Sequence, residues 1–339
     1  MNDRFSVGAV LALTIGGTLV ANDVQALTLG ADFAPDYSVT DLGAVPGLPR
    51  PYGGLTLLAG TTDTLLIGGN ANRSSGRLYS IGVNRDATTN SITGFNGTAL
   101  QFGDVGEYND GGVTYGPGGV LFTAQWNVNN LGQTRPGSTD EDRVDDLAPF
   151  GVGGSSIAAI TFVPPEFAGA GKAKIVSWSS GNFYDIGLSP DGSGTFDIDG
   201  ATQIDLDPDN AGVQSLPGGP EGFVYIDDSN AGFFVDSMLV SDFSANRVSA
   251  YELDGDGNPL VPTRRDFLTG LSGAEGAFID PVTGDFLFST FGGGDRVVRV
   301  DGFIAPPPPP GPSVIPLPAA AWLLLGAIGA LLGLRRRQS

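Results

Sequence analysis

The strongest constraint on the fold of this chain is a unit of short apolar segments that recurs five times between residues 27 and 305. Each unit begins with an opening segment that combines glycine with a short apolar run, at residues 52–57, 110–115, 154–160, 220–226 and 274–279. A second apolar run follows each opening, at residues 64–67, 120–124, 174–178, 237–241 and 285–290. Short apolar runs bounded by Gly, Asn, Asp, Ser and Pro are typical of β-strands, so we expect an all-β fold.

Two further strands are expected in each unit. The third begins with Arg and an apolar residue at 77–81, 247–251 and 296–300; it matches more weakly at 183–186 and has no recognisable counterpart in the second unit. Fourth strands are expected at residues 98–102, 203–206 and 265–268. Units of four strands, with a period longer than that of WD40 blades, predict a β-propeller. A β-sandwich or a solenoid is the alternative architecture.

The repeats indicate five blades. The alternative is six blades, with the additional blade within residues 127–154 or 191–214. The fifth unit lacks a fourth strand. Residues 37–42 read as a strand and precede the first opening, where other units have their fourth strand. We therefore expect this N-terminal strand to complete the last blade and close the ring, which removes the open sheet edges. The region resembles the NHL-like and gluconolactonase-like β-propellers.

Composition excludes several kinds of chemistry. The chain of 339 residues has no Cys and no His, so disulfides, thiolate nucleophiles, zinc fingers and Ser-His-Asp catalysis are excluded. It has 37 acidic and 17 basic residues, a formal net charge of −20, which argues against binding to nucleic acid. Its 53 glycines are consistent with many tight turns between short strands.

Three opening segments carry an acid at the same place. Glu221 and Glu275 each precede Gly, and Asp110 is the equivalent in the second unit. If the blades align, the three carboxylates converge at one mouth of the central channel, and such oxygens suit a hard cation such as Ca²⁺. The Glu-Gly pair resembles the opening of the gluconolactonase propellers, which implies a divalent metal, although Phe or Ala follows the Gly here. The alternative is that each Glu only caps backbone N–H groups.

Two other features, an acidic segment and a set of aromatic residues, are more simply explained by a structural role than by ligand binding. Asp254 to Asn258 resembles the start of a calcium loop, but position twelve is Arg265 where an EF-hand requires Glu, so we expect a turn. Trp126, Trp178 and Phe291 lie at the ends of second strands. We expect them to pack between blades, with stacking on sugars as the alternative.

The N-terminus has the pattern of a secretory signal peptide over residues 1–26. Arg4 lies in a weak basic region, residues 7–21 are mainly apolar, and Val24-Gln25-Ala26 fits the cleavage pattern of signal peptidase, which would cut after Ala26. A proline-rich spacer follows the propeller domain (27–304) at residues 305–313 and is expected to be a stiff polyproline II segment.

The C-terminus contains three ordered parts within residues 314–339. These are Pro316-Leu317-Pro318, an apolar run that includes Trp322 and fits a transmembrane helix, and the cluster Arg335, Arg336 and Arg337. This tail resembles the PEP-CTERM sorting signal in its Val-Pro-Leu-Pro-Ala form, with Ile315 in place of Val. The resemblance implies recognition and removal by an exosortase, and anchoring in the inner membrane until then. It also implies export to the outer surface or extracellular matrix of a Gram-negative bacterium.

These observations favour an exported protein whose propeller serves binding or structure, with polysaccharide or other matrix components as partners. The alternative is a divalent-metal-dependent hydrolase of the lactonase or esterase type, with its carboxylate site at the channel. No catalytic residue is identified.

Overall fold

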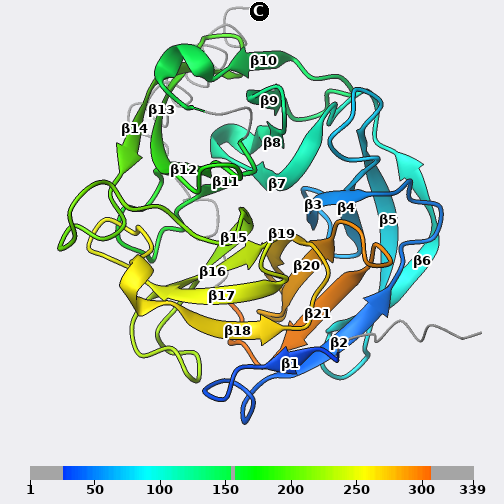
Figure 1. The fold of residues 1–339 in the computed structure, drawn as a ribbon. Coiled ribbons are helices and arrows are strands. Elements are labelled where there is room, and N and C mark those ends of the chain that lie inside the picture. Colours follow the sequence, from blue (N-terminus) through cyan, green and yellow to red (C-terminus); the bar gives the residue numbers. More distant parts are fainter. Residues whose placement is uncertain (1–25, 154–156, 307–339) are drawn as a thin grey trace, which may run out of the picture.

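In the computed structural model, which describes residues 26–153 and 157–306, five antiparallel sheets surround one axis (Figure 1). Blade 1 consists of β3 (Tyr52–Leu57), β4 (Thr64–Gly69), β5 (Arg77–Arg85) and β6 (Ile92–Gln101). Blade 2 consists of β7 (Asn109–Tyr115), β8 (Leu121–Gln125), β9 (Asn130–Thr134) and β10 (Arg143–Asp146). Blade 3 consists of β11 (Ala159–Phe162), β12 (Ala173–Val176), β13 (Phe183–Pro190) and β14 (Phe196–Ile204).

The remaining two blades each include a strand from the N-terminal region. Blade 4 consists of β15 (Pro220–Ile226), β16 (Ser237–Asp242), β17 (Arg247–Glu252), β18 (Arg265–Thr269) and, at its outer edge, β1 (Thr28–Leu29). Blade 5 consists of β19 (Ala274–Ile279), β20 (Phe286–Thr290), β21 (Val297–Asp301) and β2 (Ser38–Gly43). The prediction of an all-β, five-bladed propeller is confirmed.

The predicted ring closure is also confirmed. Strand β2 pairs antiparallel with β21, with Ser38 opposite Asp301 and Val39 opposite Val300, so the two ends of the propeller meet in one sheet (Figure 1). The short strand β1 adds a second link, in which Thr28 and Leu29 pair with Thr269 and Leu268 of the neighbouring blade. The sequence did not reveal this link. Two residues are too few to show a hydrophobic pattern.

The alternative of six blades is wrong for the described part of the chain. Residues 127–154 include β9 and β10, which complete blade 2, and residues 191–214 include all of β14, which completes blade 3. Strand β9 does not match the Arg-apolar opening because its sequence, Asn-Leu-Gly-Gln-Thr, begins with Asn and has one large apolar residue. Glu141 accepts hydrogen bonds from Thr123 and Gln125 of the adjacent β8, each at 3.0 Å, close to Gly132 of β9.

Apolar side chains fill the spaces between neighbouring blades. One cluster joins blades 4 and 5 around Phe267, Phe286 and Phe303, and another joins blades 3 and 4 around Phe183 and Phe223. The only helices among the described residues are the short 3₁₀ turns Pro117–Gly119, Ala148–Phe150 and Val261–Thr263. In that part of the chain no helix has the length and apolar character to cross a membrane.

Several predictions lie outside the described residues. These concern the signal peptide before Ala26, the spacer beyond Pro306, and the sorting signal with its transmembrane helix at residues 314–339. They stay predictions.

Candidate cation site on the propeller axis

The three acids predicted from the opening segments occupy equivalent positions in their blades. Each follows the first paired residue of an innermost strand; these pairs are Asn109 with Gln125, Pro220 with Asp242, and Ala274 with Thr290. The register of pairing shifts directly after that residue in all three strands, so Asp110, Glu221 and Glu275 all lie in β-bulges. Bulges re-aim side chains out of the regular alternation, which allows the same strand end to point toward the axis in each blade.

The three carboxylates meet, as the sequence predicted. Oxygen atoms of Asp110, Glu221 and Glu275 lie within 4.8 Å of one another, and the residues are 0%, 3% and 1% exposed. Both oxygens of Asp110, Oε2 of Glu221 and Oε1 of Glu275 are buried without a hydrogen-bond partner. Among the described residues, no Lys or Arg forms an ion pair with any of them. The alternative of simple backbone caps therefore leaves most of these oxygens unexplained.

Burial raises the pKa of all three groups. The pKa of Asp110 is raised to about 7, mainly by the loss of hydration. The pKa of Glu221 is raised well above its usual value by burial and then by the negative charge of Asp110. The pKa of Glu275 is raised by burial and then by the charges of Glu221 and Asp110. Three such groups are stable together only if they hold protons or share a cation.

Glycine allows the acids to come together. A Cβ on Gly111 would lie 2.8 Å from the amide nitrogen of Gly222, and one on Gly222 would lie 2.4 Å from that of Ala277. A Cβ on Gly276 would lie 2.6 Å from Cα of Gly54. Real Cβ atoms do not approach other atoms so closely, so any side chain at these positions would push the blades apart.

Among the described residues, the other two blades contribute no acid to the cluster. In blade 1 the equivalent position is Gly53, because Tyr52 pairs with Gly69 before the register shifts. The Ser289 hydroxyl donates a hydrogen bond to the Gly53 carbonyl (2.5 Å) and accepts one from the Gly276 amide (3.0 Å), which joins blades 5 and 1 beside the acids. The innermost strand of blade 3, β11, contains no acidic residue.

Asn72 is a site residue that the sequence search missed. Its side chain interacts with the Asp110 carboxyl group and lowers the pKa of that group, whereas its own Oδ1 is buried without a partner. Its backbone N–H donates to the Asn109 carbonyl at 3.0 Å, and its φ of 64° is in the left-handed region that Asn tolerates. Asn72 follows a second strand and not an opening segment, so comparison of opening segments could not find it.

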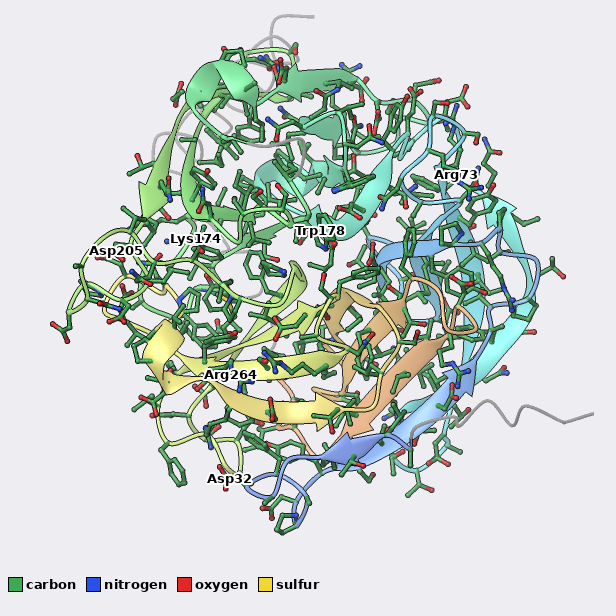
Figure 2. All side chains as sticks on the ribbon, in the orientation of Figure 1. Asp32, Arg73, Lys174, Trp178, Asp205 and Arg264 are labelled. Carbon is green, nitrogen blue, oxygen red and sulfur yellow. The ribbon has the colours of Figure 1, made fainter. Side chains whose placement is uncertain are left out.

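Four aromatic residues form an arc over the same end of the axis. Rings of Trp126 and Trp178 are 6.0 Å apart, those of Trp178 and Phe243 are 6.2 Å apart, and those of Phe243 and Phe291 are 5.7 Å apart, all edge to face. Three of their backbone amides donate to the carbonyl two residues before an acid: Trp126 to Tyr108, Phe243 to Gly219, and Phe291 to Gly273. Trp178 lies toward the centre of the ring (Figure 2). The expected packing between blades is observed, and the rings remain half-buried.

The other acidic segments do not form comparable sites. Asp254 Oδ1 accepts hydrogen bonds from the amides of Asp256 and Asn258, at 2.8 and 2.9 Å, so this segment is the expected turn. Asp227, Asp228 and Asp236 also lie close together, but they are only partly buried or exposed. Asp236 accepts a hydrogen bond from the Asp228 amide, and Asp227 accepts one from the Ser229 amide.

Comparisons with known proteins do not assign the chain to a family. No protein-family model matches the chain, and no curated protein matches it. Among solved structures, the PQQ-bound aldose sugar dehydrogenase from Streptomyces coelicolor is 12% identical, with 77% of this chain and 84% of that chain covered and a TM-score of 0.40. An auxiliary nutrient binding protein from Bacteroides thetaiotaomicron is 11% identical, with 78% and 76% covered and a TM-score of 0.43.

A third match is the PQQ domain of pyranose dehydrogenase from Coprinopsis cinerea. It is 12% identical, with 82% of this chain and 97% of that chain covered and a TM-score of 0.38. Likeness at this level carries no argument about this chain, so the fold assignment rests on its own five sheets and their pairing.

Proposed function

We propose that this protein is an exported, exosortase-sorted protein of the cell surface or extracellular matrix, whose propeller holds a divalent cation on its axis and serves binding or structure. The single observation that supports the cation is the group of four buried carboxylate oxygens without partners, contributed by Asp110, Glu221 and Glu275. Bringing three ionised carboxylates together in a buried site without a compensating cation is unfavourable.

The donor set favours Ca²⁺ over softer metals. All available side-chain atoms are oxygens, and the chain has no Cys or His to provide sulfur or imidazole. Ca²⁺ binds oxygen at roughly 2.3–2.6 Å, so two of its ligands are at most about 5 Å apart, and the carboxylate oxygens, which lie within 4.8 Å of one another, are close enough to share one ion. The interaction of the Asn72 side chain with Asp110 lowers the pKa of that carboxyl group and so favours its ionised form. Asp110, Glu221 and Glu275 would therefore be the ligands.

Burial favours binding or structure over catalysis. A metal-dependent hydrolase must bring its substrate to the ion, but the three acids are at most 3% exposed and the aromatic arc lies over their end of the axis. A cation held here would join blades 2, 4 and 5. Hydrolysis of lactones or esters is the alternative, and it requires this arc to open.

The proposed location and partners follow from the ends of the sequence. The signal-like residues before Ala26 would be removed by signal peptidase, and the tail at residues 314–339 would be recognised by an exosortase. Matrix polysaccharide is the proposed ligand class for the outer face, because Trp126, Trp178, Phe243 and Phe291 place half-buried rings among polar loops.

The test is calorimetric titration of the metal-depleted full chain in non-ionic detergent with Ca²⁺. We expect one site, and we expect Glu221→Gln to weaken Ca²⁺ binding at least tenfold because it removes a charged ligand. Glu107→Gln is the matched control, since Glu107 is exposed. Absence of binding, or equal binding by the two variants, contradicts the proposed site. Calcium-dependent turnover of lactones that Glu221→Gln abolishes would favour the hydrolase instead.

A further inference from the structure

A cavity of about 490 Å³ occupies the axis beyond the three acids. Its walls come from the later residues of the innermost strands, among them Tyr115 of β7, Thr161 of β11, and Phe278 of β19. Gly111 and Gly222 line it, whereas the acids that directly precede them, Asp110 and Glu221, do not. The cavity and the cation site are therefore two separate features on opposite sides of the tightly packed glycines.

The cavity has the size and wall chemistry of a site for a small molecule. Pockets for such ligands typically measure about 300–1,000 Å³ and combine apolar walls with a few polar groups. Here Tyr115 and Phe278 contribute aromatic surface, and Thr114 and Thr161 contribute hydroxyl groups. The Thr161 hydroxyl donates to the Phe223 carbonyl at 3.1 Å, which keeps that part of the wall in place.

The charge around the cavity has one sign. The described residues that line it include two acids, Glu166 and Asp227, and no Lys or Arg. Negative charge beside aromatic walls favours a positively charged guest, because the face of an aromatic ring also attracts cations. An anionic guest would find no positively charged partner among these residues.

The last described segment of the chain forms one wall. Phe303, Ile304 and Pro306 all line the cavity. The Ile304 amide donates to Oδ1 of Asn230 at 2.7 Å, and Phe303 packs into the core between blades 4 and 5. This hydrogen bond and this packing hold the wall against both of those blades.

We propose that this axial cavity binds a small organic cation that carries an aromatic or aliphatic ring. The site is independent of the proposed Ca²⁺ site. The ring lies against the aromatic walls, and the positive group lies toward Glu166 and Asp227.

The experiment compares three fluorinated probes of nearly equal shape. These are 4-(trifluoromethyl)benzylammonium, 4-(trifluoromethyl)benzyl alcohol and 4-(trifluoromethyl)benzenesulfonate, titrated with the full chain in non-ionic detergent and followed by ¹⁹F NMR line broadening. We expect the ammonium probe to bind at least tenfold more tightly than the sulfonate, with the alcohol between them. Chelation of divalent ions with EDTA should not change this order.

Two substitutions locate the binding. Thr161→Trp fills the cavity and should abolish binding of the ammonium probe, whereas Thr93→Trp, the same change on the exposed outer strand β6, should not. Glu166→Lys keeps the cavity but reverses the charge, and should reduce the preference for ammonium over sulfonate at least tenfold; Glu107→Lys is its control. Equal binding of the ammonium and sulfonate probes, or ammonium binding that survives both Thr161→Trp and Glu166→Lys, would overturn the proposal. Loss of binding in EDTA would overturn it too.

Discussion

Single glycine residues determine how closely the blades approach one another at the axis. Gly54, Gly111, Gly222 and Gly276 belong to four different blades, and each lies where an added Cβ would meet another strand. Because the space is too small for any side chain, these positions require glycine for a steric reason. The same crowding brings Asp110, Glu221 and Glu275 together, so the packing of the axis and the candidate cation site depend on the same residues.

Gly276→Ala tests this steric role. The new methyl group would lie 2.6 Å from Cα of Gly54 and 2.8 Å from Cδ2 of Leu55, so we expect the free energy of unfolding to fall by about 3 kcal/mol in a urea titration. Gly255→Ala is the matched control, because no atom lies within 4 Å of its added Cβ and its φ is ordinary. It should change stability by less than about 0.5 kcal/mol. Equal stability of the two variants would contradict the steric explanation.

The raised pKa values predict a dependence of stability on pH that a cation should remove. In EDTA, the folded protein keeps protons on Asp110, Glu221 and Glu275 at pH values where the unfolded chain has released them. The unfolded pKa values are roughly 4, and that of folded Asp110 is about 7, with Glu221 and Glu275 also raised. The native state then binds more protons than the unfolded state, so stability must decrease as pH rises through this window.

The measurement is the thermal midpoint of the full chain between pH 5 and pH 8, with EDTA and with saturating Ca²⁺. We expect a fall of several degrees in EDTA and a smaller or reversed change with Ca²⁺, because a bound cation stabilises the ionised carboxylates. Glu221→Gln should reduce the fall in EDTA. A midpoint in EDTA that rises over this range would show that the three acids are already ionised in the folded protein.

At the level of elements, the ring depends on strands and on contacts that join neighbouring blades. Strand β2 completes blade 5, and β1 attaches the same N-terminal segment to blade 4. The fully buried Lys174 lies between blades 3 and 4 (Figure 2). Its ammonium group pairs with Asp185 and donates to Oδ1 of Asn258 at 2.5 Å. The chain has no Cys, so these noncovalent contacts stabilise the ring without disulfides.

A designed disulfide tests the importance of the closing strand. Ser38 and Asp301 are paired across β2 and β21, so Ser38→Cys with Asp301→Cys would close a loop of about 260 residues. The chain-entropy relation assigns about 5 kcal/mol to a loop of this size and about 3 kcal/mol to a short one. We therefore expect a larger rise in the thermal midpoint on oxidation than for the control pair Ser80→Cys with Leu100→Cys, which are partners in β5 and β6. A larger gain for the control pair would argue against closure through β2.

At the level of the whole molecule, the negative charge belongs to the part that we propose is exported. Residues 27–313 contain 35 acids and 13 bases, a net charge of −22, because residues 1–26 and 314–339 contain two acids and four bases. Three of those bases are Arg335, Arg336 and Arg337 in the sorting-like tail. A net charge of this size keeps a protein soluble and favours cations over anions as ligands.

Deletion of residues 314–339 tests the proposed destination. If the tail is a sorting signal, the shortened protein should be released or remain in the periplasm, and the full chain should fractionate with the envelope or the extracellular matrix. The measurement is immunodetection in cell fractions of a Gram-negative host that has an exosortase. A second variant, in which Arg335, Arg336 and Arg337 are all changed to Gln, should retain the fold of the propeller. Altered fractionation of this variant would therefore report a defect in sorting and not in folding. Identical fractionation of all three proteins would contradict the sorting proposal.

The sequence by itself predicted the class of fold, a count of five blades and the closing strand, and it left six blades as an alternative that the structure excludes for the described residues. Each of these depends on hydrophobic runs that repeat along the chain, as at residues 220–226 and 274–279. The repeats also aligned Asp110, Glu221 and Glu275. Equivalent positions in repeated strands lie at the same level around the axis of a propeller. Strands without a repeated pattern, such as β1 and the polar β9, were not found.

Tertiary structure alone decided what those acids can do. Their burial, their distance of 4.8 Å or less and their missing partners follow from the bulges and from glycines of neighbouring blades, which are distant in sequence. Asn72 joins them from a loop of blade 1, and the axial cavity is formed by strands of all five blades and by residues 303–306. Such features depend on distances between segments that are far apart in the chain, and a linear pattern contains no information about those distances until the ring is closed.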